Sequence, residues 1–223
     1  MPKSKREKVV TLAKTAGRTV DRAAKAAFIT SLRAHVDAHT NLYVFSVANS
    51  RNAQLKALRA TWKADSRFFF GRNALASVAL GRSAADEYAD NLHLVSRRLV
   101  GDVGLLFTNR PDADVRAFFA TYVKPDFART GAAATSRVAL DAGPLPQFVA
   151  SQEPALRALG LPVSLVRGVV TLMGDFVVCE AGDTLAAPRA KLLEMLGIAM
   201  ADFRVDLLCH LATKDGKFTD LKA

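Results

Sequence analysis

The stretch Leu42-Tyr-Val-Phe-Ser-Val47 is followed by Asn49-Ser-Arg-Asn52 and then by apolar residues at Leu55, Leu58 and Trp62. The first six residues are rich in β-branched and aromatic side chains and have the length of a strand rather than a helix. Polar residues break this run, and the spacing of the next three apolar residues predicts a helix. A strand that turns directly into an amphipathic helix is typical of an α/β fold.

The segments on either side continue this pattern. Upstream, apolar residues recur every fourth position, which predicts a helix from about residue 19 to residue 39. Downstream, Arg67-Phe-Phe-Phe70 is predicted as a second strand that ends at Gly71, and Val103-Gly-Leu-Leu-Phe107 as a third. We therefore expect a mixed sheet flanked by helices.

Further helices are predicted between and after these strands. Asn73 is expected to cap one helix and Gly81 to end it, and apolar residues between Tyr88 and Leu99 form the stripe of the next. A later helix start combines a cap, a proline and two acids near the positive dipole end. Its residues are Thr108 or Asn109, Pro111, Asp112 and Asp114.

The composition changes at Lys124-Pro125, after which prolines and glycines are frequent. Val169–Met173 and Phe176–Cys179 are strand-like and are expected to turn at Gly174-Asp175. We interpret this region as a smaller β-rich α+β domain inserted into the first. A helix at residues 189–196 and a strand at 203–209 are expected to return to the main sheet.

These patterns divide the chain into four parts. They are a basic N-terminal tail at residues 1–17, a main α/β domain at 18–124 plus 188–212, an inserted domain at 125–187, and a short C-terminal tail at 213–223.

The composition limits the class of partner. Half of the 223 residues are hydrophobic, enough for one or two globular domains. A net charge of +10 favours an anionic partner, and nucleic acid and acidic membrane surfaces both satisfy this. Arg167, Gly174 and Asp175 interrupt the most hydrophobic stretch, so no membrane-spanning helix is expected. A secretory signal is not indicated, whereas a mitochondrial transit peptide stays open because the first 28 residues are basic and poor in acids.

The usual signatures of cofactors and catalysis are absent from the sequence. There is no phosphate-binding loop, dinucleotide fingerprint, nucleophile elbow or HExxH pair. His35 and His39 are one helical turn apart but lack a third ligand, and the place of Asp112 and Asp114 in a helix's first turn is explained by capping and dipole effects. Cys179 and Cys209 are interpreted as reduced, buried thiols. We therefore expect no cofactor, metal or small-molecule substrate, and no enzyme.

Basic residues gather at three places that suit phosphate binding. The first is the tail, with Lys3, Lys5, Arg6 and Lys8, whose flexible cations neutralise phosphates without a fixed fold; a solvated or nuclear-import tail is the alternative. The other two are strand-to-helix turns, one with Arg51, Asn52 and Lys56 and one with Arg72 and Asn73. In a parallel sheet both turns would project from one edge, and both helix starts would face the same anion.

Several separated segments together resemble a known family, the ribosome assembly factors called mRNA turnover protein four, over essentially the whole chain. The segments are Met1-Pro-Lys-Ser-Lys-Arg6, Tyr43-Val-Phe-Ser-Val47 with Arg51-Asn52, Ser66-Arg-Phe-Phe-Phe-Gly-Arg-Asn73, Asp102-Val-Gly-Leu-Leu-Phe-Thr-Asn-Arg110 and Leu159-Gly-Leu-Pro162. Their agreement in order and spacing is more specific than any single glycine pattern.

The resemblance implies a paralogue of the protein at the base of the large-subunit ribosomal stalk. It implies RNA-facing turns at Arg51, Asn52 and Lys56 and at Gly71, Arg72 and Asn73. The partners implied are large-subunit rRNA at the stalk base, proteins of the large-subunit precursor, and a release factor similar to dual-specificity phosphatases. The implied location is the nucleolus and nucleus, with shuttling to the cytoplasm.

Two rival functions stay open at this point. One is a structural protein of the mature stalk base, in the cytosol or in mitochondria. The chain stops at Ala223, before the stalk protein's recruiting helices and acidic tail, which favours a placeholder over a working stalk. The other is a hydrolase or transferase with a site in the inserted domain.

Overall fold

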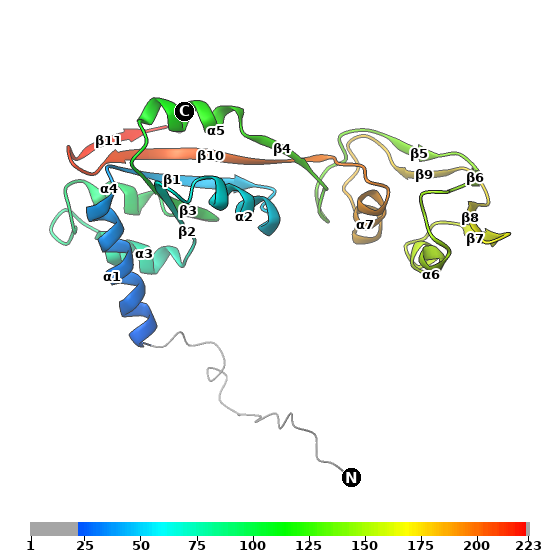
Figure 1. Cartoon of the computed structure of the whole chain (residues 1–223), viewed down its shortest axis with the longest axis horizontal. Helices are drawn as coiled ribbons and strands as arrows, with labels where there is room; N and C mark the ends of the chain where they lie inside the picture. The colour runs from blue at the N-terminus through cyan, green and yellow to red at the C-terminus, as the bar shows by residue number, and fades with distance from the viewer. Residues whose placement is uncertain (1–21, 222–223) are drawn as a thin grey trace, which may run out of the picture.

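A computed structural model describes residues 22–221 and shows a main domain with a smaller insert beyond one end of its sheet (Figure 1). The six strands of the main sheet are β1 (Asn41–Ala48), β2 (Ser66–Phe69), β3 (Val103–Thr108), β4 (Val123–Asp126), β10 (Ala201–Ala212) and β11 (Lys217–Asp220). Their order is β11-β10-β1-β3-β2, with β4 also paired to β10. Every pair is antiparallel.

Helices cover both faces of this sheet. α1 (Arg22–Ala38), α3 (Asn73–Leu80) and α4 (Leu92–Arg97) pack on one face, against Leu42 and Val44 of β1. α2 (Asn52–Thr61) and α5 (Asp112–Thr121) pack on the other, against Tyr43 and Phe45. Successive side chains of a strand point to opposite faces, so a strand covered on both sides is apolar throughout. The predicted α/β class is confirmed.

The predicted helix starts need correction. Asn73 is the first residue of α3 rather than its cap, because its side chain donates to the Gly101 carbonyl oxygen at 2.8 Å. Pro111 precedes α5 with no side-chain cap. The two expected caps are used elsewhere, since the Thr108 hydroxyl accepts from Ser66 and the Asn109 side chain accepts from the Thr40 backbone N–H.

The helix predicted from the stripe between Tyr88 and Leu99 is shorter than expected. α4 begins at Leu92 because Asn91 has a left-handed backbone with φ of 63°. Tyr88 lies outside the helix, where its hydroxyl donates to Asp37 at 2.7 Å. Leu92, Val95 and Leu99 are buried as predicted.

The insert has a hydrophobic core of its own, formed by residues between Ala128 and Met200. Its elements are β5 (Val138–Leu140), β6 (Gly143–Pro144), a short 3-10 helix (Ala150–Gln152), α6 (Glu153–Ala158), β7 (Val163–Val166), β8 (Val169–Leu172), β9 (Phe176–Cys179) and α7 (Ala187–Met195). β8 and β9 are strands as predicted, but they do not pair with each other. β8 lies between β6 and β7, and β9 pairs with β5.

Two predicted boundaries differ from the structure. α7 was assigned to the main domain, but Ala190, Leu192 and Leu193 face the core of the insert. The chain therefore returns to the main sheet at β10, after Met200. The predicted C-terminal tail contains β11, which pairs with the end of β10 and continues the sheet by one strand.

A glycine in β3 is required by the packing of the central strands. A Cβ atom added at Gly104 would lie 2.5 Å from Cζ of Phe45, which is fully buried. We expect Gly104→Ala to lower the free energy of unfolding by about 1–3 kcal/mol, because the overpacked core must shift. Denaturant unfolding of Gly174→Ala is the control, since nothing lies within 4 Å of a Cβ there. Equal stability of the two variants would contradict the packing argument.

Candidate nucleic-acid interface

Three chain segments meet at one end of the main sheet: the end of β1, the end of β2 and the start of β3. β1 and β2 are each antiparallel to β3, which lies between them, so they run in the same direction. The two turns that follow them therefore project from the same edge. The parallel pairing assumed from the sequence is wrong, but the structure brings the two turns together.

A hollow of about 600 Å³ opens where these segments meet. Its walls are partly fixed by side-chain hydrogen bonds, one from Asn73 to the Gly101 carbonyl oxygen and one from Asn49 to the Asp202 carbonyl oxygen at 2.9 Å. The lining residues are Val47, Asn49, Ser50, Phe70, Gly71, Asn73, Gly101, Asp102, Val103 and Arg129.

Two helices begin beside this hollow. The residue before α2 is Arg51 and the residue before α3 is Arg72, and neither helix has a side-chain cap or an acid in its first turn. The first N–H groups of a helix lack partners within it and carry the positive end of the helix dipole. Two such helix starts at one edge favour binding of a phosphate-bearing ligand.

The two arginines have different surroundings. The Arg51 guanidinium donates to the Phe127 carbonyl oxygen at 2.9 Å and lies 3.5 Å from Asp126, with only 29% of its side chain exposed. These contacts join the first turn to the strap that enters the insert. The Arg72 side chain is exposed and makes no hydrogen bond or ion pair within residues 22–221. Arg72 is thus free to bind an anion, whereas Arg51 first stabilises the turn.

The other predicted site residues in the two turns are placed as follows. Asn52 and Lys56 are exposed on α2, and Asn73 is half-buried. Gly71 is needed for packing, since a Cβ there would lie 2.9 Å from the Phe28 ring of α1. Lys3, Lys5, Arg6 and Lys8 precede the described residues, so the structure does not place them.

A second basic groove lies beside the hollow and was missed by the sequence analysis. It has a volume of about 520 Å³ and contains Lys56, Arg59 and Lys63 of α2 and the turn after it, with Arg67 of β2. The Arg59 guanidinium lies 4.9 Å from the centre of the Phe70 ring, and Phe70 also lines the hollow. The spacing of the first three cations, three and four residues apart, places them on one helix face and could have revealed the groove.

The insert also contributes a cation to this edge. Arg129 lines the hollow and donates to the Ser50 carbonyl oxygen in the loop before α2. It also lines a hollow of about 400 Å³ at the junction with α7, together with Arg51 and Lys191. No local pattern could reveal this residue, because it is 79 positions away from Ser50.

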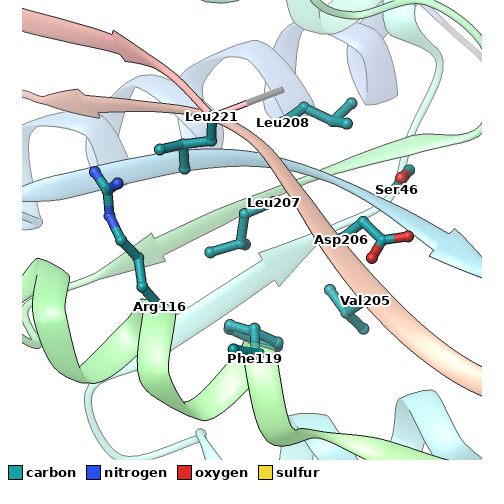
Figure 2. Close-up of a pocket in the computed structure, with 9 residues that line it drawn as sticks. Ser46, Arg116, Phe119, Val205, Asp206, Leu207, Leu208 and Leu221 are labelled. Carbon is teal, nitrogen blue, oxygen red and sulfur yellow. The ribbon is translucent and has the colours of Figure 1, made fainter. Parts of the chain in front are cut away.

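A hollow on the other side of the sheet has different chemistry (Figure 2). It has a volume of about 650 Å³ and is lined by α5, β10 and the chain after β11. Phe119, Leu207 and Leu221 give it an apolar wall. Its cation, Arg116, is already paired with Asp112 at 2.8 Å, so this hollow does not suit a phosphate chain.

The carboxylate and histidine pairs noted in the sequence have structural roles. Burial alone would raise the pKa of Asp112, but hydrogen bonds from Arg116 and Tyr43 outweigh it and the pKa is lowered. Asp112 therefore stays ionised and accepts from the Tyr43 hydroxyl at 2.7 Å. The pKa of His35 is lowered by burial and then by His39. Within residues 22–221 no group of three metal-ligating side chains occurs, and no helix is long and apolar enough to cross a membrane.

Two family models match the chain and together cover most of it. The model described as ribosomal protein L10 matches residues 20–124. The model described as the insertion domain in the 60S ribosomal form of that protein matches residues 128–198. The fold and these matches define an L10-type protein with an inserted domain.

Individual relatives narrow this class. The chain is 37% identical to ribosome assembly factor mrt4 of Schizosaccharomyces pombe, over 96% of this chain and 92% of that protein. It is 34% identical to mrt4 of Dictyostelium discoideum, over 92% and 90%. It is also 31% identical to large ribosomal subunit protein uL10 of Thermococcus sibiricus, over 61% of this chain and 40% of that protein. The chain belongs to the Mrt4 family of ribosome assembly factors, which is related to uL10, and the predicted resemblance is confirmed.

The different surroundings of the two arginines give a test of their roles. We expect Arg51→Ala to lower the free energy of unfolding by about 1–2 kcal/mol, because the Phe127 carbonyl and the Asp126 carboxylate lose a charged donor. Arg72→Ala should change it by less than about 0.5 kcal/mol, since the side chain is exposed and unpaired. Denaturant unfolding measures both. A loss in Arg72→Ala as large as in Arg51→Ala would contradict this assignment.

Proposed function

We propose that this protein binds the stalk-base region of large-subunit rRNA in pre-ribosomal particles, as a placeholder that is later exchanged for the mature stalk protein. The observation that carries the proposal is the single edge where two uncapped helix starts, the exposed Arg72 and the basic groove of α2 meet. Membership of the ribosome assembly factor family directs this anion-binding edge toward ribosomal RNA.

The chemistry of the edge suits a folded RNA backbone. Cations on α2 and β2 form a track on which successive phosphates are neutralised with release of counterions. Backbone N–H groups at the helix starts add directed donors, which set the orientation of the RNA without reading its sequence. The exposed ring of Phe70, beside Arg59, offers a surface on which an unstacked base packs.

Exchange follows from shared use of one site. The relatives named uL10 have the same L10-type domain, so a protein of that kind competes for the same RNA rather than binding beside it. In this proposal no bond is made or broken, and the protein is not an enzyme. Release is assisted by a factor similar to dual-specificity phosphatases, and the protein works in the nucleolus and nucleus and shuttles to the cytoplasm.

Charge reversal at the edge tests RNA binding. We expect Lys56→Glu with Arg72→Glu to weaken binding to a stalk-base RNA fragment by roughly tenfold or more, because two phosphate contacts become repulsive. The slope of log K against log salt should become shallower by about 1.4–1.8, since about 0.7–0.9 is lost per phosphate. Filter binding or fluorescence anisotropy at several salt concentrations measures both quantities.

A matched control separates site binding from net charge. Arg82→Glu with Lys214→Glu makes the same change in charge at the opposite end of the sheet, because Arg82 follows the far end of α3 and Lys214 lies in the turn between β10 and β11. This control should change affinity by no more than about twofold at moderate salt. Equal weakening by the two double variants would show that the edge is not the RNA site.

The placeholder role is tested by where the protein is found. We expect it to sediment with nuclear precursors of the large subunit and to be absent from polysomes, because the mature stalk protein has by then taken the same RNA. Quantitative mass spectrometry of sucrose-gradient fractions measures this distribution. Recovery in polysomes at ribosome stoichiometry would instead identify a structural protein of the mature stalk.

A further inference from the structure

The outer face of the β7–β8 hairpin in the insert is apolar. In this antiparallel pair Val166 lies opposite Val169 and Ser164 opposite Thr171, so these four side chains share one face, and alternation adds Met173 just past β8. The opposite face holds Val163, Val170 and Leu172, which are buried in the insert's core. The apolar residues of the outer face therefore contribute nothing to that core.

Exposure on this face is high for residues of this kind. Val166, Val169 and Met173 are 47%, 41% and 65% exposed, and the neighbouring Leu165 is 46% exposed. The solvent face of an antiparallel sheet is ordinarily polar, and clustered exposed apolar side chains mark sites of interaction. β7 is also an edge strand, since the order of this sheet is β6-β8-β7.

The turn of the hairpin places a cation at the tip of this face. Arg167 and Gly168 both have positive φ, 51° and 82°, as a two-residue hairpin turn requires. Asn or Gly is favoured at the first of these positions, and another residue in the left-handed region costs about 1–2 kcal/mol. Within residues 22–221 no acid or carbonyl group accepts from the Arg167 side chain. The segment from Val163 to Met173 contains no acidic residue.

We propose that this hairpin face, with Arg167 at its tip, binds a protein of the large-subunit precursor that presents a carboxylate bordered by apolar side chains. The unpaired guanidinium requires an acid in the partner, and the valines around it require an apolar border. RNA does not suit this face, because a single cation without an aromatic side chain offers neither a phosphate track nor a stacking surface.

The location of the face agrees with a partner other than the RNA. The hairpin lies at the end of the insert farthest from the main sheet, while the basic edge lies where that sheet meets the insert (Figure 1). The two surfaces can therefore be occupied at once. The inference relies on the proposed function only for the particle in which the partner is found, because RNA binding and partner binding use different residues.

Site-specific crosslinking tests the face directly. Val166 is replaced by photoreactive benzoylphenylalanine in the full chain, which is expressed in cells before precursor particles are purified and irradiated. We expect a crosslink to one protein of the particle and no crosslink from the same replacement at Val177, a valine of similar exposure on β9. A crosslink to rRNA or to a second copy of this chain, or equal products from both positions, would overturn the proposal.

The tip is tested by Arg167→Gly, which removes the guanidinium and relieves the left-handed strain at once. If the arginine served only the turn, the variant would fold and join particles as well as the parent chain does. We expect an unchanged or higher melting temperature, unchanged affinity for stalk-base RNA, and roughly tenfold weaker retention on particles that keep the partner, as loss of one charged contact gives. Unchanged retention would sink the proposal, whereas lost RNA affinity alone would count against the basic edge.

Discussion

The burial of β1 on both faces is the constraint on which the rest of the structure depends. Leu42 and Val44 face α1, α3 and α4, while Tyr43 and Phe45 face α2 and α5. Because β1 lies between β10 and β3, it also joins the segment after the insert to the segment before it. Fixing β1 therefore fixes where its end meets the end of β2 and the start of β3, and the anion-binding edge is built from that meeting.

Much of the main domain could be predicted because local patterns carry it. The strands at 42–47, 67–70 and 103–107 are each nearly continuous apolar runs, and such runs occur where both faces of a sheet are covered. Strand direction could not be predicted in this way. The short connections suggested parallel neighbours, whereas β3 inserts between β1 and β2 and makes both of its pairings antiparallel. Apolar spacing identifies a strand but not its partner.

The insert was harder to predict because its boundaries depend on packing. The apolar residues of α7 have the spacing of any core helix, and only their contacts show which of the two cores they complete. The same limit applies to the candidate site. Arg72 and the α2 cations are apparent from local spacing, but the contact between Arg129 and Ser50 joins distant parts of the chain. The predicted role of Arg51 as a free cation also failed to include its acceptor at Phe127.

The arrangement at this edge suits a protein that must bind firmly and later leave. Arg51 and Arg129 hold the loop before α2 from the side of the insert, so the loop is ordered before any RNA arrives and less conformational entropy is lost on binding. The side chains of the remaining cations, Arg72, Lys56 and Lys63, are exposed and unpaired within the described residues. Contacts of exposed cations with phosphate are screened by water and salt and are lost one at a time. A competitor that brings the same helix starts can therefore replace them stepwise, without first opening a buried pocket.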